Sequence, residues 1–180
     1  KTLLLLDFNE TGLFDLMEEL RMSHGQLASR AKPIIASITD REKLSRIVDA
    51  AKPDVIFHAA AYKHVPLMED FPDEAVRTNI FGTLNLAEAA RKHRVPKFVF
   101  VSTDKAIRPV SVMGKTKRAA ELVVQALNEL GPTKFVSVRF GNVIGSRGSV
   151  VPLFEEQIKR RAPITVTHPE MTRYFMTIPE

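Results

Sequence analysis

The chain has 180 residues, of which 44% are hydrophobic, and it carries a formal net charge of +5. This size suits one domain with its own core; the lack of cysteine excludes disulfides and thiolate metal sites, and the apolar runs are far too short to cross a bilayer. Basic residues are scattered among acidic ones, which argues against a nucleic-acid partner and suits a small anionic one. We expect a cytoplasmic protein with no metal, no nucleic acid and no membrane contact by this chain.

Apolar runs and helix-spaced apolar residues alternate along the chain. In chain order they predict a strand at 2–6, a helix from Asn9 to about residue 20, a strand at 33–36, a helix from Asp40 to about residue 52, a strand at 55–57, a helix at about 73–93, a strand at 97–101, a helix at 113–130, a strand at 135–138 and a helix at 152–160. Asn9 and Asp40 are the expected N-caps. Strands separated by helix-length segments form parallel β-α-β units, so the predicted fold class is α/β, a doubly wound parallel sheet of the Rossmann type.

The predicted sheet lacks its first strand. In dinucleotide-binding folds, an acidic residue at the tip of the second strand binds the adenosine ribose, about 20 residues after a Gly-rich turn. Asp7 has this character, but the chain contains no G-x-G-x-x-G before it or anywhere else. We therefore expect a domain truncated at the N-terminus, without first strand and Gly-rich turn, and also at the C-terminus. The strands that end at Asp7 and His58 should lie on either side of the gap.

Polar residues follow the predicted buried strand at 97–101. The segment Ser102–Lys105 stands where open α/β sheets place their ligands. Lys117 follows Met113 by four residues on the next predicted helix, so both side chains share one face. On chemistry alone, the pattern favours a turn or N-cap role for Asp104 over a catalytic one, and a solvated helix lysine is a serious alternative for Lys117.

Several motifs occur together and in order over the whole chain. They are His58–Pro66 (HAAAYKHVP), Thr78–Thr83 (TNIFGT), Ser102–Ala106 (STDKA), Arg139–Ser146 (RFGNVIGS) and Met171–Phe175 (MTRYF). With them the chain resembles the CapD-like polysaccharide biosynthesis proteins, the UDP-N-acetylglucosamine 4,6-dehydratase group of the extended short-chain dehydrogenase/reductases. Met113, at the position where the superfamily usually has Tyr, resembles the larger branch of that group, which is anchored in the inner membrane.

The resemblance implies an NAD(P)-dependent lyase in surface polysaccharide biosynthesis. Residues 1–180 would form part of the NAD(P)-binding domain, and 140–180 would begin the nucleotide-sugar part. The sugar would be oxidised at C4, lose water across C5 and C6, and be reduced at C6. Asp104 would protonate the leaving hydroxyl, Lys105 would take the C5 proton, and Thr103 would orient the C4 oxygen. Met113 cannot carry a proton, so a neighbour or Asp104 would deprotonate the C4 hydroxyl.

The resemblance also implies binding residues, a cofactor and partners. The cofactor would be NAD or NADP, and Phe8, where a 2′-phosphate would need a basic partner, favours NAD. The substrate would be a UDP-sugar, and the protein a homo-oligomer. The cofactor residues would be Asp7, Ser37, Ile38, Ala59, Ala60, Ala61, Ser102 and Lys117, and the substrate residues Lys63, Asn142 and Arg173.

Two other functions remain open from the sequence. A nucleotide-sugar 4-epimerase would oxidise and reduce C4 without needing an acid and a base at C6 and C5, so Asp104 and Lys105 argue against it. A non-catalytic nucleotide-binding fragment would explain the missing Gly-rich turn. On this last reading, these 180 residues alone would be inactive.

Overall fold

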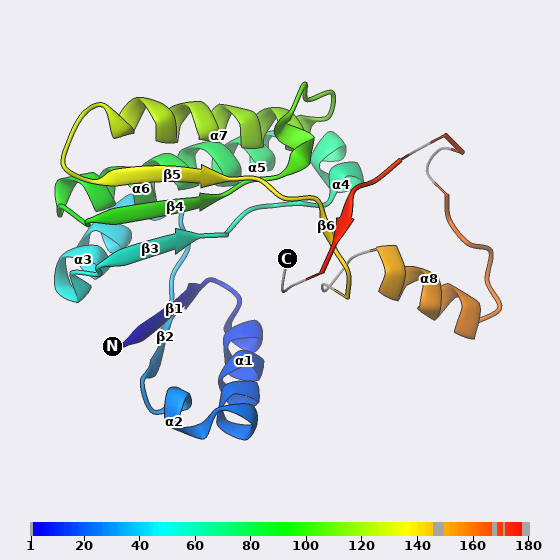
Figure 1. Cartoon of the computed structure of the whole chain (residues 1–180), viewed down its shortest axis with the longest axis horizontal. Coiled ribbons are helices and arrows are strands. Elements are labelled where there is room, and N and C mark those ends of the chain that lie inside the picture. Colours follow the sequence, from blue (N-terminus) through cyan, green and yellow to red (C-terminus); the bar gives the residue numbers. More distant parts are fainter. Residues whose placement is uncertain (1, 146–149, 167–168, 171, 178–180) are drawn as a thin grey trace.

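The computed structural model describes residues 2–145, 150–166, 169–170 and 172–177. Figure 1 shows the arrangement of its elements. The strands are β1 (Leu3–Asp7), β2 (Ala31–Ile35), β3 (Val55–His58), β4 (Lys97–Val101), β5 (Lys134–Val138), β6 (Asn142–Val143) and β7 (Phe175–Met176). The helical elements are α1 (Glu10–Ser23), α2 (Gly25–Ala28), α3 (Arg41–Ala51), α4 (Val65–Asp70), α5 (Pro72–Ala75), the π-helical η1 (Val76–Gly82), α6 (Thr83–Lys92), the 3₁₀ turn η2 (Asp104–Ala106), α7 (Val112–Asn128) and α8 (Val150–Lys159).

The strand ladders are parallel and fall into three sheets. β1 pairs with β2, β4 lies between β3 and β5, and β6 pairs with β7. Among the described residues no ladder joins β1 to β3, although β1 and β2 lie beyond β3 on the side away from β5 (Figure 1). The predicted parallel α/β fold is confirmed. So is the gap between the strands that end at Asp7 and His58.

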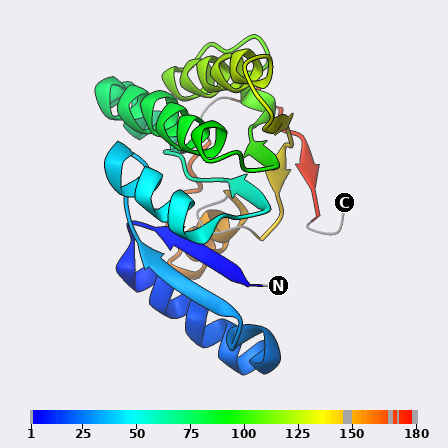
Figure 2. The ribbon, with the colours of Figure 1, turned by 90° about the vertical axis from the view of Figure 1, so that its left-hand side faces the viewer.

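Helices α3, α6 and α7 cover one face of the β3–β4–β5 sheet, as Figures 1 and 2 both show. Strand side chains alternate between faces, so every second residue of β4 points toward these helices. Phe98 and Phe100 are fully buried there and pack in one cluster with Leu44 of α3, Leu86 of α6 and Val124 of α7. This cluster is the main core, and it fixes β4, whose carboxyl end leads into the candidate site.

The opposite face of the same sheet is apolar and much more open. Phe57 of β3 is 74% exposed, and Val136 and Val138 of β5 are exposed beside it. The register places Phe57, Val99 and Val136 side by side across the three strands. Helix α1 instead packs against β1 and β2.

Local signals in the sequence predicted most elements closely. Asn9 and Asp40 are confirmed as N-caps, because their side chains accept the backbone N–H of Gly12 and Lys43. The single helix expected at 73–93 is a continuous run of α5, η1 and α6. The pairing of β6 with β7 was not predicted. In the described part of the chain, no helix has the length and apolar character required to traverse a bilayer.

Candidate active site

The residues predicted to orient the sugar and transfer its protons, Thr103, Asp104 and Lys105, follow the carboxyl end of β4. After Val101 the chain leaves the ladder but stays tied to the extension of β5: Ser102 N donates to Val138 O at 2.7 Å and Asp104 N to Phe140 O at 3.1 Å. Thr103 then caps η2 through its side-chain oxygen. The backbone of this segment is therefore held on both sides before any ligand binds.

Three predicted site residues meet at one ammonium group. Lys105 Nζ lies 3.0 Å from Asp104 Oδ1 and 2.9 Å from Asn142 Oδ1. The Thr103 hydroxyl donates to the same Asp104 oxygen at 2.9 Å. The two charged side chains are about three-quarters buried, so this pair is screened by water less than a surface ion pair.

The charge state of Asp104 follows from these contacts. Burial acts to raise the pKa of Asp104, but hydrogen bonds from Lys105 and Thr103 and the charge of Lys105 outweigh it and hold the pKa below its ordinary value. The sequence-based role of Asp104 as an acid requires a raised pKa. The structure has the reverse, a carboxylate in an ion pair with Lys105.

Lys117 lies beneath this segment, on α7. Its side chain is almost fully buried, its Nζ donates to Val101 O at 2.7 Å, and the same atom is 4.1 Å from the centroid of the Phe100 ring. Burial lowers the pKa of Lys117 to about 8, and the charge of Glu121 opposes this shift. A solvated helix lysine is therefore excluded, and a cation is fixed at the end of β4.

Met113 is buried one turn before Lys117. It packs with Met68 and Ala75, and Tyr62 borders this cluster. The next residue, Gly114, faces the segment that follows β4 so closely that a Cβ added there would collide with the carbonyl oxygen of Lys105. The start of α7 thus fits tightly under η2, and this role of Gly114 was not predicted from the sequence.

Glu121 ties the ends of β4 and β5 to α7. It is 4% exposed and accepts hydrogen bonds from Ser102 Oγ (2.6 Å), Arg139 Nε (2.7 Å), Arg139 Nη2 (2.5 Å) and Arg118 Nη1 (2.9 Å). Burial acts to raise the pKa of Glu121, but these donors lower it to about 2. The sequence offered one signal for Glu121: it stands four residues after Lys117, on the same helix face. The predicted cofactor residue Ser102 has its hydroxyl committed here.

A second buried network holds the end of β3. His58 Nε2 lies 2.8 Å from Thr83 Oγ1, and the Thr83 hydroxyl bonds Asn79 O. The Asn79 amide in turn contacts both backbone polar atoms of Tyr62 and the hydroxyl of Thr116 on α7. The loop that carries Ala59–Ala61 is thereby fixed to η1 and α7.

The other predicted cofactor residues follow the carboxyl ends of β1, β2 and β3. Asp7 is exposed at the tip of β1, where Oδ1 accepts the Asn9 N–H at 2.9 Å. The Ser37 hydroxyl lies 2.8 Å from that of Thr39. Ile38 is buried in the main core, so only its backbone could face a ligand. An exposed carboxylate, the small side chains of Ala59–Ala61 and the Lys117 cation are groups that suit a dinucleotide.

The predicted substrate residues lie on two other segments. Lys63 is exposed in the loop before α4. Arg173 is exposed, and its guanidinium donates to Thr172 O at 3.1 Å. The neighbour of Arg173, Tyr174, accepts the backbone N–H of Asn142 at 2.8 Å. Asn142 and the Arg173 segment are therefore connected.

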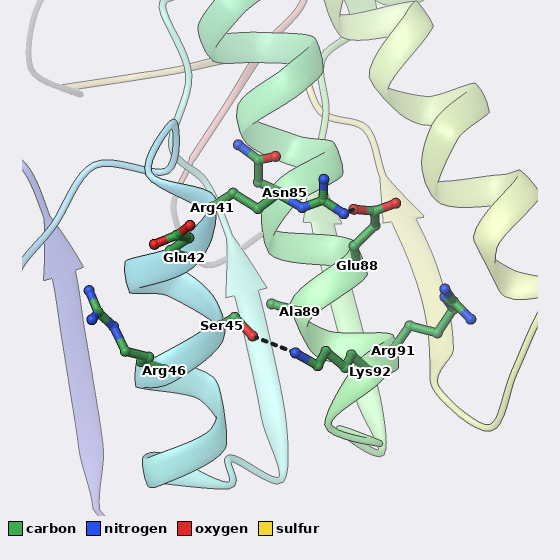
Figure 3. Close-up of a pocket in the computed structure, with 9 residues that line it drawn as sticks. All are labelled: Arg41, Glu42, Ser45, Arg46, Asn85, Glu88, Ala89, Arg91 and Lys92. Carbon is green, nitrogen blue, oxygen red and sulfur yellow. Dashed lines mark hydrogen bonds and ion pairs between the residues drawn. The ribbon is translucent and has the colours of Figure 1, made fainter.

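The hollow drawn in Figure 3 lies elsewhere. It is a cavity of about 640 Å³ between α3 and α6, lined by Arg41, Glu42, Ser45, Arg46, Asn85, Glu88, Ala89, Arg91 and Lys92. Arg41 pairs with Glu88 across it at 2.8 Å. None of the predicted site residues lines this cavity, so it is not the candidate active site.

Comparison with known proteins agrees with these features. The family model described as polysaccharide biosynthesis protein matches residues 1–180. The chain is 52% identical over 179 residues to the capsular polysaccharide biosynthesis protein CapD of Staphylococcus aureus, covering 99% of the chain and 30% of that protein. It is 40% identical over 176 residues to a UDP-glucose 4-epimerase of Rickettsia bellii, covering 96% of the chain and 51% of that protein.

Solved structures give the same answer for the fold. Pen from Bacillus thuringiensis has a TM-score of 0.91 and 41% identity, with 99% of this chain and 56% of that one covered. WbmG of Bordetella bronchiseptica, solved in complex with NAD and UDP, has a TM-score of 0.76 and 25% identity, with 99% and 57% covered. The chain thus spans about a third to a half of the curated relatives named above. Because the family model matches its whole length, the chain belongs to the polysaccharide biosynthesis protein family.

Proposed function

We propose that the full-length protein carrying this chain is a nucleotide-sugar 4,6-dehydratase acting on UDP-N-acetylglucosamine in capsule, O-antigen or other surface polysaccharide biosynthesis. The observation that carries the proposal is the contact of Lys105 with Asp104 at the end of β4, with Nζ and Oδ1 3.0 Å apart. Elimination of water needs a base for one carbon and an acid for the oxygen on the next. Simple oxidation and reduction of C4 needs neither at C5 and C6.

NAD or NADP would bind along the carboxyl ends of β1, β3 and β4. Asp7 would accept hydrogen bonds from ribose hydroxyls, Ala59–Ala61 would admit the dinucleotide close to the backbone, and Lys117 would hold the nicotinamide ribose. When bound, the cofactor supplies the redox chemistry, removing a hydride from C4 and returning it at C6. The NAD complex of WbmG supports this assignment.

The chain's own residues would move the protons. Thr103 would hydrogen-bond the C4 oxygen. The proton that the C4 hydroxyl loses as its hydride leaves would pass through a neighbouring group to solvent, because Met113 cannot take it. Before elimination, Lys105 must pass one proton to Asp104, because the resting pair is ionic. Lys105 then takes the C5 proton while Asp104 gives its proton to the C6 hydroxyl, which leaves as water. The pair regains its resting charges, and C5 later takes back a proton.

Arg173 and Asn142 would contribute to the nucleotide-sugar side. A guanidinium suits a diphosphate because its fork of donors matches two oxygens. Lys63 would add a second cation from the loop after β3. Homo-oligomerisation, and a position on the cytoplasmic side of an inner membrane, remain predictions of the family resemblance.

A 4-epimerase is the second candidate, and the 40% identity to the Rickettsia bellii enzyme favours it. Mass spectrometry of the nucleotide sugar separates the two. The full-length protein, incubated with UDP-N-acetylglucosamine and NAD, should give a product one water lighter than the substrate. A product of unchanged mass that is the C4 epimer would replace the dehydratase proposal with the epimerase.

A further inference from the structure

Asn142 connects the candidate base to a distant strand. Its side-chain oxygen accepts a hydrogen bond from Lys105 Nζ at 2.9 Å. Its backbone N–H donates to Tyr174 O at 2.8 Å, next to Arg173. One residue therefore bonds the ammonium group of Lys105 through its side chain and the Arg173 segment through its backbone.

The approach of the two strands at Asn142 is unusually close. A Cβ added to Gly141 would lie 2.7 Å from Tyr174 O and 3.0 Å from Tyr174 Cβ, so the residue before Asn142 must be glycine. The ladder then pairs Asn142 with Phe175 and Val143 with Met176. This contact fixes the backbone of Asn142 from a strand that the β3–β4–β5 sheet does not contain.

A lysine side chain needs a second hydrogen-bond acceptor if its Nζ is to stay in one place. Its ammonium carries three donors on a flexible stem, and a single carboxylate on the adjacent residue leaves much of that freedom. Asn142 adds an acceptor from a second element, and it does so without adding charge. The ion pair with Asp104 and the bond to Asn142 together define where Nζ lies.

We propose that Asn142 is a positioning residue for Lys105, rather than only a contact for the nucleotide sugar, and that it couples the placement of Nζ to the β6–β7 pairing beside Arg173. This inference rests on the proposed function for the role of Lys105 as the base. Substrate held at Arg173 and alignment of Lys105 would then depend on each other. Losing the side chain of Asn142 should misplace the base while the substrate still binds.

Steady-state kinetics of the full-length protein provide the first test. Asn142→Ala should lower kcat for UDP-N-acetylglucosamine about 10- to 100-fold, as expected for a misplaced catalytic group, with KM raised by a clearly smaller factor than kcat is lowered. Asn128→Ala is the matched control, because Asn128 also accepts one hydrogen bond at 2.9 Å, from Phe135 N, away from the site. A raised KM with unchanged kcat would mean that Asn142 only binds substrate, and would overturn the proposal.

Acetylation of the ligand-free protein gives a readout that needs no activity. The side chain must leave its hydrogen-bond acceptors before it can attack the reagent, so each acceptor slows the reaction. Relative to the exposed Lys97, acetylation of Lys105 by N-hydroxysuccinimidyl acetate should be roughly 3- to 10-fold faster in Asn142→Ala, the factor for one lost hydrogen bond. Asn142→Asp, which keeps an acceptor, should show no acceleration.

The two measurements separate the two proposals. Equal acetylation of Lys105 in wild type and Asn142→Ala would overturn the positioning role, even if the protein proves to be a dehydratase. The same holds if Asn142→Asp reacts as fast as Asn142→Ala. Acetylation of Lys105 could be faster in Asn142→Ala but not in Asn142→Asp, while the protein yields no dehydrated sugar. That result would support the positioning of Lys105 by Asn142 and overturn the proposed function.

Discussion

Lys105 Nζ and Asp104 Oδ1 form an ion pair of 3.0 Å, so the proton that this pair shares lies on Lys105, the residue proposed as the base. The proposed chemistry needs the neutral pair, with that proton on Asp104. Excluding water from a partly buried pair disfavours the two charges and favours their neutral forms. Substrate binding over η2 would therefore prepare the site by favouring the neutral pair.

The first prediction concerns His58 and acid stability. Burial, with a smaller contribution from the charge of Lys117, lowers the pKa of His58 to about 3. In the unfolded chain the side chain takes up this proton at its ordinary pKa of 6.5, so the folded state loses stability as pH falls from 6.5 toward 3. Between about pH 7 and about pH 5, His58 alone should cost about 2 kcal/mol of unfolding free energy.

Urea unfolding at the two pH values measures this cost. His58→Gln replaces the titrating side chain with a polar one that does not titrate, so the part of the pH dependence that comes from residue 58 should disappear. If wild type and His58→Gln lose equal stability on acidification, the burial of a neutral His58 is wrong.

Glu121 should matter more to stability than its position on a helix suggests. Glu121→Gln removes the buried carboxylate to which Arg139, 37% exposed, and the Ser102 hydroxyl donate, so we expect a loss of about 1–3 kcal/mol. Arg118→Ala removes a side chain that is 42% exposed and should lower the free energy of unfolding by less than about 1 kcal/mol. Chemical denaturation of the two variants measures both losses of unfolding free energy. Equal losses would contradict the conclusion that Glu121 holds the ends of β4 and β5 to α7.

Gly114 is predicted to be intolerant of even one methyl group. Its Cβ would collide with the Lys105 carbonyl, so Gly114→Ala should shift η2, lower turnover and destabilise the fold by about 1–3 kcal/mol. Gly25→Ala is the control, because nothing lies within 4 Å of the added carbon there. Similar turnover and melting temperatures for the two variants would show that α7 and η2 are packed less tightly than described.

The fourth prediction concerns the chain of 180 residues by itself. It contains no G-x-G-x-x-G, the turn whose backbone N–H groups ordinarily hold a pyrophosphate. Losing two charge-assisted bonds weakens binding about 10²–10⁴-fold. Calorimetric titration of residues 1–180 should therefore detect weak NAD(P) binding or none, and micromolar affinity would show that this turn is dispensable.

The sequence predicted those parts of the structure that depend on local signals. Helix starts at Asn9 and Asp40 follow from one side chain and the next turn, and the strand at 97–101 follows from its apolar run. The gap beside the strand that ends at Asp7 followed from a missing motif. Each of these needs only neighbouring residues or the known order of strands in the fold.

The remaining features depend on contacts between distant residues. The backbone of Asn142 bonds that of Tyr174 where β6 pairs with β7. Each of these strands has two residues, too few to show the alternation of apolar and polar residues that predicts a strand. Glu121 acquires its role only when Arg139 and Ser102 arrive from two strand ends. The ion pair of Asp104 with Lys105 reverses the protonation that their roles suggested, because pKa depends on burial and partners that the sequence does not specify.

The most direct test of the account is the label that solvent deuterium leaves on the sugar. Full-length protein turning over UDP-N-acetylglucosamine with NAD in heavy water should give a 4-keto-6-deoxy sugar carrying deuterium at C5, detected by NMR. Asp104→Asn and Lys105→Ala should each slow its formation about 10²–10⁴-fold, the usual contribution of a general acid or base. A C4 epimer without deuterium at C5, or losses below about tenfold in both variants, would contradict the assignment of Asp104 and Lys105.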